Sequence, residues 1–466
     1  MLQRMLTGES ALSLLAELQP QQPLYLEERQ VSEAVQQEVE AAEAVDMHTH
    51  LFTEGHGAGI QYGIDAMLTY HYLVAEFLKS SKEDAETFYK RPQVQQAEQV
   101  WQGLFIQASP LSEPCRGVLT TLNALGLRKE VAKRDLQAIR RWYAGQDANM
   151  FNEKMMRLAR LRYVITSHDP FDELEAAACL EPIPPQPRYQ RALALDKLVE
   201  GDWASVLRSL ASASEAKTLQ GVFKLLKRCI SAVRPLFLTA ATPHNFVYAQ
   251  DEDLEIQISG FSFPAQKRRR LIPADEPLDA ACPPSPQLVL DVVILPLCRE
   301  YGLPLSLRMG TRRAVNPALG LAGDGAGPAR LEALACLCRL NPSIKFLVTV
   351  LSRTDQHEAS VLAGKFCNLH LWGCWWFCNN PSIVSDVTAM RMEMLGTGFT
   401  YQTSSARVHD QLIYKWIHAR ALLARLLTGK YLELMSTGWS VSRNDIRRDV
   451  HRLLGGAFEE FIAKPV

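Results

Sequence analysis

Val45-Asp46-Met47-His48-Thr49-His50-Leu51 has the residue pattern of a β-strand and is predicted to be the first strand of the chain. Alternate side chains of a strand share a face, so we expect Asp46, His48 and His50 to point one way and the residues between them the other. Two imidazoles on one face at a strand end can hold one divalent metal ion or one substrate. A lone His-x-His pair can also be two ordinary polar residues at a strand end. The rest of the sequence is therefore needed to tell whether the pair is functional.

After residue 161, short apolar runs alternate with helical patterns, which is typical of a parallel sheet whose strands are joined by helices. The predicted strands are 45–51, 161–167, 192–195, 235–241, 304–309, 345–351, 366–372 and 398–403. This set predicts an α/β fold of the closed (β/α)8 TIM-like barrel type. An open doubly wound sheet is the second architecture, although no glycine-rich G-x-G-x-x-G sequence follows any of these strands.

The chain is predicted to have one main domain with two additions. Residues 1–44 are expected to form N-terminal helices that pack on the barrel, and residues 45–466 to form the barrel itself. The long stretch after the first strand has helical spacing of apolar residues and little strand character. We therefore expect a helical insertion over residues 55–155 rather than a connection of minimum length.

The composition is that of a soluble globular protein, with 47% hydrophobic and 22% charged residues and a formal net charge of −1. This balance gives no electrostatic reason to expect nucleic acid or an anionic membrane as a partner. There is no apolar run long enough for a membrane span and no apparent signal peptide. The ten cysteines do not form a spaced disulfide framework. We expect a cytoplasmic protein, with homo-oligomer formation left open.

Polar residues collect where the predicted strands end, and a barrel places its site at the C-terminal ends of its strands. They are His48 and His50, Thr166-Ser167-His168-Asp169, Thr242-Pro243-His244, Arg308 with Arg312 and Arg313, Trp375-Trp376, and Arg407. Arginine binds a carboxylate through two hydrogen bonds, hydroxyls and imidazoles bind sugar hydroxyls, and an indole can cover a ring. The pattern therefore predicts a small anionic, polyhydroxylated ligand, a sugar acid.

The chain resembles the uronate isomerase (glucuronate isomerase) family of the amidohydrolase superfamily. The matching stretches are Asp46–Leu51, Tyr70–Tyr72, Thr166–Asp172, Leu307–Asn316, Leu319–Gly325, Leu369–Phe377 and Thr403–Arg407. Their order and spacing agree with the family over roughly residues 25 to 460. The most specific parts are Trp375-Trp376-Phe377 and the histidine pair His48 and His50.

The resemblance implies an aldose–ketose isomerisation of D-glucuronate to D-fructuronate by proton transfer between C2 and C1. It also implies a divalent metal, commonly zinc, on His48, His50 and an aspartate of the last strand. We expect His71 to transfer the proton, with Arg308 and His244 as further catalytic candidates. The candidates for substrate binding are Tyr72, Arg312, Trp375, Trp376 and Arg407.

Four positions depart from the family pattern. Thr403 stands, within one position, where the family has its metal-binding aspartate, and Arg308 stands where the family has a histidine. Thr242-Pro243-His244 replaces a Ser-Asp-His sequence, and Ala194-Leu195 occupies the place of an arginine. Two neutral histidines alone bind zinc weakly compared with three or four ligands.

These departures leave three alternatives for the metal and two for the function. The metal is dispensable, or Asp46, His71 or His244 completes its site, or the chain is a paralogue with altered chemistry. Arg308 could replace the cation as an electrophile but not act as a base, because it stays protonated. The other functions are a metal-dependent hydrolase, weakened by the missing aspartate and by the lack of a lysine after residues 235–241, and a non-catalytic sugar-acid-binding relative.

Overall fold

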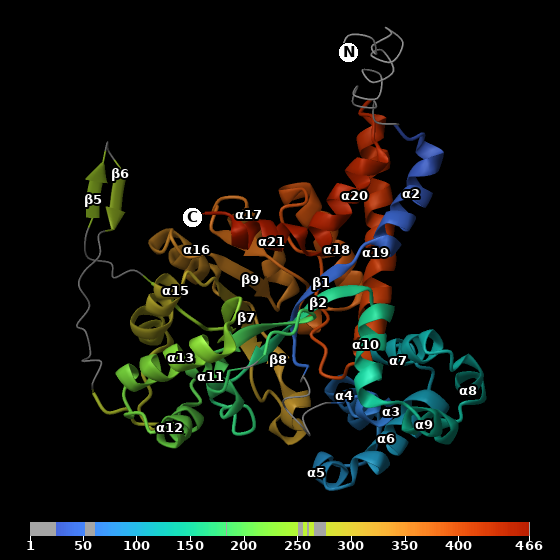
Figure 1. Cartoon of the computed structure of the whole chain (residues 1–466), viewed down its shortest axis with the longest axis horizontal. Coiled ribbons are helices and arrows are strands. Elements are labelled where there is room, and N and C mark those ends of the chain that lie inside the picture. The colour runs from blue at the N-terminus through green and yellow to red at the C-terminus, as the bar shows by residue number, and fades with distance from the viewer. Residues whose placement is uncertain are drawn as a thin grey trace, which may run out of the picture.

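A curled parallel sheet forms the centre of the molecule in the computed structural model, which describes residues 25–51, 61–182, 184–249, 255–258, 261–264 and 276–465 (Figure 1). The strand order is β1-β2-β3-β4-β7-β9-β10. The strands are β1 (Ala44–Thr49), β2 (Leu161–His168), β3 (Tyr189–Ala194), β4 (Phe237–Pro243), β7 (Leu305–Arg312), β9 (Phe346–Val350) and β10 (Leu369–Leu371). Seven of the eight predicted strands are thus confirmed, including the weak one at 192–195.

The eighth predicted strand, 398–403, is an irregular segment that closes the ring between β10 and β1. Thr400 forms a parallel bridge with Trp372, directly after β10. On the other side, the backbone N–H of Ser405 donates to the carbonyl of His48 at 3.1 Å. The sheet therefore curls into a TIM-like (β/α)8 barrel, although two backbone hydrogen bonds on each side, rather than a regular ladder, join its last segment to the neighbouring strands.

Helices surround the barrel and bury the outward faces of its strands against one large apolar cluster. They are α11 (Asp196–Glu200), α12 (Trp203–Ser212), α13 (Leu219–Val233), α14 (Pro286–Val289), α15 (Leu295–Tyr301), α16 (Leu331–Leu340), α17 (Gln356–Ala363), α18 (Pro381–Leu395), α19 (Gln411–Ser436), α20 (Arg443–His451) and α21 (Ala457–Ala463). The N-terminal helix α2 (Glu28–Ala41) packs on the barrel beside α19 (Figure 1). The first part of the predicted helical stretch 1–44 lies outside the described residues.

The chain between β1 and β2 forms a group of helices that lies to one side of the sheet and has its own apolar core (Figure 1). They are α3 (Ile64–Leu68), α4 (His71–Ser80), α5 (Ala85–Tyr89), α6 (Gln93–Trp101), α7 (Glu113–Ala124), α8 (Arg128–Lys133), α9 (Leu136–Ala144) and α10 (Ala148–Leu158). Asp410, at the start of α19, ties this insertion to the barrel. Its carboxylate accepts hydrogen bonds from the Tyr143 hydroxyl at 2.6 Å and the Gly63 N–H at 2.8 Å.

The predicted alternation along β1 is wrong at its end. The pairing of β1 with β2 shifts register between Asp46 and Thr49, as at a β-bulge. Asp46 consequently contacts the outer helix α19, where the Trp416 indole N–H donates to its carboxylate at 3.0 Å. His48 instead lies inside the ring, 3.3 Å from Arg308. The extra residue of the bulge therefore separates two side chains that a regular strand would place together.

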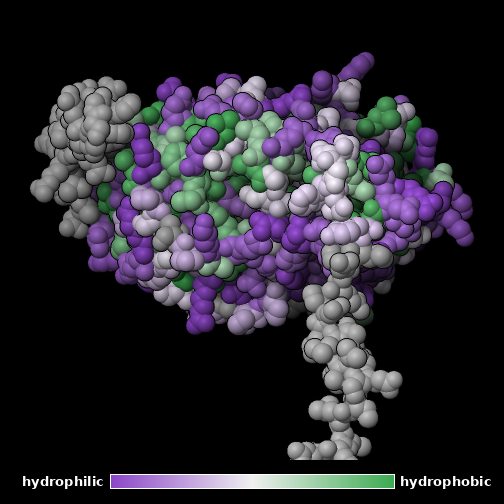
Figure 2. Space-filling model, turned by 90° about the horizontal axis from the view of Figure 1, so that it is seen from above, coloured by the Kyte–Doolittle hydropathy of each residue, from purple (hydrophilic) through white to green (hydrophobic). Residues whose placement is uncertain are grey.

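The shorter elements include a hairpin, β5 (Glu255–Ile258) with β6 (Phe261–Pro264), and the strand β8 (Gly325–Ala326) beside β7. The face shown in Figure 2 mixes hydrophilic and hydrophobic residues, as globular domains do. Within the described ranges, no helix has the length and apolar character needed to cross a membrane.

Candidate active site

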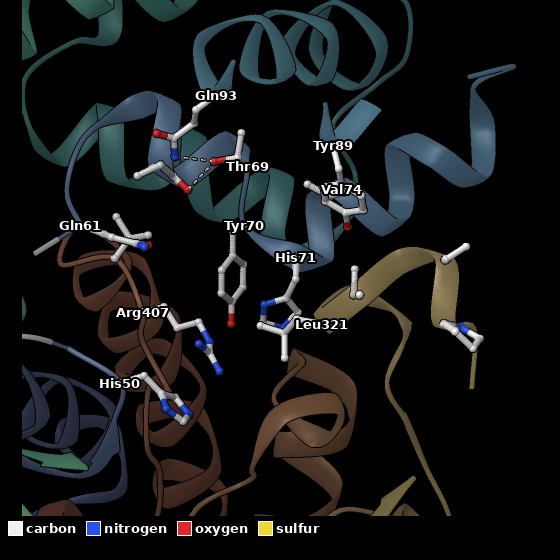
Figure 3. Close-up of a pocket in the computed structure, with 16 residues that line it drawn as sticks. His50, Gln61, Thr69, Tyr70, His71, Val74, Tyr89, Gln93, Leu321 and Arg407 are labelled. Carbon is white, nitrogen blue, oxygen red and sulfur yellow. Dashed lines mark hydrogen bonds between the residues drawn. The ribbon is translucent and has the colours of Figure 1, made fainter. Parts of the chain in front are cut away.

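Two adjoining cavities lie where the helical insertion meets the C-terminal ends of the barrel strands. The outer cavity has a volume of about 510 Å³ and the inner cavity about 90 Å³. Both are lined by His50, Tyr70, His71, Leu321 and Arg407, so they form one site (Figure 3). The inner cavity adds six residues, which are Asp196, Arg308, Arg313, Trp375, Trp376 and Ser405.

The helical insertion and a barrel loop meet over the outer cavity. The Tyr89 hydroxyl of α5 donates to the carbonyl of Leu319 at 2.8 Å. Leu319 belongs to a 3-10 turn, Pro317–Gly323, that follows β7 and lines the same cavity. The insertion therefore covers the barrel end and supplies one wall of the site.

Arg308, on β7, is fixed by three neighbours. Its Nη2 donates to both carboxylate oxygens of Asp196, at 2.5 and 2.7 Å. Its Nη1 lies 3.3 Å from Nε2 of His48, and its guanidinium carbon lies 5.4 Å from the ring centroid of Trp375. These contacts hold a buried positive charge at a defined place in the inner cavity.

His48 and His50 lie edge to face at the end of β1, with ring centroids 4.7 Å apart. Nδ1 of His48 lies 3.5 Å from the Ser167 hydroxyl of β2. Burial lowers the pKa of both imidazoles well below the usual value, and the positive charges of Arg308 and Arg407 lower it further. Both rings are therefore neutral at pH 7.

His71 begins α4 and projects into the cavity with Tyr70, the residue at the N-cap position (Figure 3). Both ring nitrogens of His71 are buried and have no hydrogen-bond partner in the described part of the chain. Its ring packs between Tyr70 and Tyr72, with centroid distances of 4.1 and 4.4 Å. Burial, followed by the charge of Arg407, lowers the pKa of His71 to about 3. This neutral imidazole has a lone pair available for a ligand proton.

Three arginines line the inner cavity, and only one of them lacks a carboxylate partner among the described residues. Arg308 pairs with Asp196, and Arg313 pairs with Glu200 at 3.0 Å and with Asp324 at 2.6 Å. The Arg407 guanidinium lies between Tyr70 and His50 (Figure 3). Arg407 is half-buried and has no anion beside it in the described chain, so its guanidinium is suited to a ligand carboxylate.

Comparisons with known proteins identify the family of the chain. No family model matches the chain, and no curated protein matches it. The chain is similar to the crystal structure of a uronate isomerase from Bacillus halodurans C-125, with 35% identity, a TM-score of 0.83, and coverage of 95% of this chain and 98% of that chain. The chain belongs to the uronate isomerase family. The resemblance inferred from the sequence is thus confirmed.

Two more distant structures share the fold of this uronate isomerase family member. The uronate isomerase from Thermotoga maritima has 15% identity, and the glucuronate isomerase from Caulobacter crescentus has 14%. Both align with a TM-score of 0.68 over 94% of this chain, and over 100% and 95% of their own lengths.

The metal site that the uronate isomerase resemblance implies does not fit the side chains present. Within the described ranges, no three His, Cys, Asp or Glu residues are grouped to hold a metal ion. The Asp46 carboxylate is occupied by Thr403, Ser404 and Trp416, at 2.8, 3.0 and 3.0 Å. Thr403 therefore faces Asp46, and Ser405 is the residue of this segment that lines the cavity. Metal binding itself stays a prediction.

Six of the ten predicted site residues come from the barrel strands or from the loops that follow them. They are His48, His50, Arg308, Trp375, Trp376 and Arg407. Five of these line the inner cavity, and the sixth, His48, contacts Arg308. His71 joins them from the insertion. This convergence follows from the barrel, because it gathers the carboxyl ends of its strands at one rim.

Four predicted site residues lie outside the lining of both cavities, and one of them, His48, contacts the lining residues His50 and Arg308. Tyr72 packs on Phe377, with ring centroids 5.9 Å apart, and Arg312 is exposed. His244 is half-buried and its backbone N–H donates to Thr311 at 2.9 Å. Their assigned roles stay predictions.

Five residues that line the inner cavity were given no site role from the sequence, namely Tyr70, Asp196, Arg313, Leu321 and Ser405, although Arg313 and Ser405 were noted at the predicted strand ends. Two of them are close neighbours of predicted residues, because Tyr70 stands two positions before Tyr72 and Arg313 directly follows Arg312. The available signal for Asp196 was its position at the end of β3, where a carboxylate follows an apolar strand.

Proposed function

We propose that this chain is a hexuronate isomerase that interconverts D-glucuronate and D-fructuronate and also accepts D-galacturonate. Arg407 is the observation that carries the proposal. It is a half-buried arginine without a carboxylate partner in the described chain, and it lines both cavities together with the unpartnered imidazole of His71. Membership of the uronate isomerase family supports the reaction class.

In the proposed reaction, Arg407 binds the carboxylate of the open-chain sugar and His71 transfers the proton. His71 removes the proton from C2, and the electron pair of that C–H bond forms a double bond between C1 and C2. The charge moves to the oxygen on C1, and the hydroxyl proton on O2 then passes to O1. His71 returns its proton to C1, which leaves the ketone at C2.

The low pKa of His71 is compatible with this role because its causes change when substrate binds. Arg407 is the second-largest cause of the lowered pKa, after burial. A substrate carboxylate paired with Arg407 cancels part of that positive charge and raises the pKa of His71. Substrate binding thus increases the basicity of His71 in the complex that has to react.

Hydrolysis by a metal-bound water is less compatible with the described residues, because the hydrolytic mechanism needs a metal centre with several protein ligands. The group of His48 and His50 lacks a third donor there. A non-catalytic sugar-acid-binding role would use Arg407 but leaves no use for an unpartnered His71 beside it.

Turnover of D-glucuronate and D-galacturonate in D2O tests the proposal. NMR should show the ketose product and deuterium at C1, because the proton on His71 exchanges with solvent during the enediol step. D-glucose, which lacks the carboxylate, is the matched control and should turn over at least about 100-fold more slowly in kcat/KM. Failure of every hexuronate to turn over would contradict the assignment.

Two further expectations from the sequence accompany this function. We propose a cytoplasmic location, which fits the absence of a spaced disulfide framework among the ten free cysteines. Assembly into a homo-oligomer stays a prediction, which the mass of the purified protein in solution would test.

A further inference from the structure

We propose that the guanidinium of Arg308 replaces the divalent metal in this isomerase, so that turnover needs no metal ion. The inference rests on the proposed function and adds the identity of its electrophile. It follows from the position of Arg308 beside Nε2 of His48, and from the hydroxyl side chains of the barrel's last segment.

Arg308 lies against the atom that would bind a metal. Its Nη1 is 3.3 Å from Nε2 of His48, and its Nη2 donates to both oxygens of Asp196. A metal ion on Nε2 of His48 would stand next to a fixed positive charge and repel it. To make room, Arg308 would have to break both hydrogen bonds to Asp196 and leave the face of Trp375.

The last segment of the barrel supplies hydroxyls where a metal site would need a carboxylate. The Thr403 hydroxyl lies 2.8 Å from a carboxylate oxygen of Asp46 and 2.9 Å from the carbonyl oxygen of His48, which share its one proton, and Thr403 does not line either cavity. Ser405 lines the inner cavity, and its buried hydroxyl has no partner within the described chain. A neutral hydroxyl does not balance the charge of a divalent ion, whereas it can donate a hydrogen bond to a sugar oxygen.

The chemistry of the isomerisation is complete with Arg308 in this position. When His71 removes the C2 proton, negative charge develops on the oxygen at C1. A guanidinium held rigidly in a buried cavity stabilises that charge without reorganising. Arg308 cannot serve as the base, since it stays protonated, so the two roles fall to different residues. Asp196 acts as a positioning residue, because both of its carboxylate oxygens accept hydrogen bonds from Arg308.

The first test measures metal directly on the whole purified chain. Protein dialysed against EDTA should contain less than about 0.1 equivalents of zinc, manganese or iron by mass spectrometry, and titration with zinc should show no site tighter than about 10 μM. D-Glucuronate turnover should stay within about twofold of the undialysed enzyme. One tightly bound metal per chain, with turnover lost on chelation and restored by that metal, would overturn the inference.

The second test changes the electrophile and keeps its charge. Arg308→Lys should lower kcat by about 100-fold and change KM by less than about threefold, because a lysine cannot reach both Asp196 and the reacting oxygen. Arg353→Lys is the control, since Arg353 pairs with Asp386 on the surface. A folded Arg308→Lys enzyme with normal kcat would contradict the proposal.

Asp196→Asn covers the case in which Arg308→Lys does not fold. It leaves Arg308 in place but removes the anion that orients it, so kcat should fall about tenfold and the loss should not be rescued by zinc. Rescue by zinc would count against the inference. The metal titration is carried out without substrate, so a tight metal site overturns the inference whether or not a hexuronate turns over. Failure of every hexuronate to turn over contradicts the proposed function instead.

Discussion

Buried polar groups on the two sides of β1 differ in whether the protein supplies their hydrogen-bond partners. On the cavity side, the ring nitrogens of His71 and the hydroxyl of Ser405 have no partner in the described chain. Behind the strand lies a junction made of Asp46, Thr403, Ser404 and Trp416. There the carboxylate of Asp46 accepts three short hydrogen bonds.

This difference distinguishes residues that can bind a ligand from residues that stabilise the fold. A buried polar group without a partner costs about 1–3 kcal/mol, and beside the cavity a bound ligand can supply the missing partner. At the junction, the protein itself satisfies Asp46 and joins the first strand to the last segment. Substitutions in the cavity should therefore lower activity, and substitutions at the junction should lower stability.

The largest effect is expected at His71. His71→Gln keeps a polar side chain of similar size but removes the proton acceptor, so kcat should fall about 1,000-fold. The melting temperature should be unchanged or slightly higher, because neither ring nitrogen makes a hydrogen bond to the described chain. His357→Gln, at an exposed position on α17, is the control. A large fall in stability together with normal kcat would show that His71 stabilises the fold and does not take part in the reaction.

Arg407 should affect binding more than the chemical step. Arg407→Gln should raise KM for D-glucuronate by about 10- to 100-fold with a small change in kcat, because a charge-assisted hydrogen bond to the substrate carboxylate is lost. Steady-state kinetics with D-glucuronate and D-glucose measure this. If the preference for the acid over the neutral sugar survives the substitution, another residue binds the carboxylate.

The pH dependence offers a finer test of the same cavity. His71 must be unprotonated to act, and its pKa of about 3 keeps it so well below the ordinary histidine value. Plots of log(kcat/KM) against pH should therefore be flat from pH 8 to about 5, instead of falling below about 6.5. Arg407→Gln removes a neighbouring positive charge, so the acid limb should move to higher pH. An acid limb near 6.5 in the unmodified enzyme would show that a different base is used.

At the junction, Asp46→Asn should lower the free energy of unfolding by about 1–3 kcal/mol, because the amide turns an N–H group toward the donors that the carboxylate accepts. Urea denaturation measures this, and the folded enzyme should keep its kcat within about twofold. The exposed Asp386→Asn is the matched control. A change in kcat without a change in stability would place Asp46 in the reaction.

The smallest effect is expected at Thr403. Thr403→Val keeps the shape of the side chain and removes the hydroxyl that donates to Asp46 and to the His48 carbonyl. The expected loss is about 1 kcal/mol in the same urea experiment, with normal kcat. Loss of activity or of metal content here would indicate that Thr403 belongs to the cavity after all.

Local patterns were enough for most of the strands and for the barrel rim. Apolar runs and helical spacing depend on neighbouring residues, so β2, β4, β7 and β9 were located from the sequence alone. The rim followed because a barrel brings its strand ends together, which united His50 with Arg407. The helix after β1 was also located, although its cavity-facing aromatic residue is Tyr70 rather than the predicted Tyr72.

Contacts between distant segments required the folded structure. The shift in the pairing of β1 with β2 turns Asp46 away from His48. A bulge of this kind adds one residue to the strand, and the alternation of side chains in the sequence does not predict where that happens. Likewise, the ion pair of Arg308 with Asp196 joins residues 112 positions apart. The residue types that can carry out the chemistry were thus legible in the sequence, whereas which of them are bound to each other and which remain free depends on three-dimensional packing.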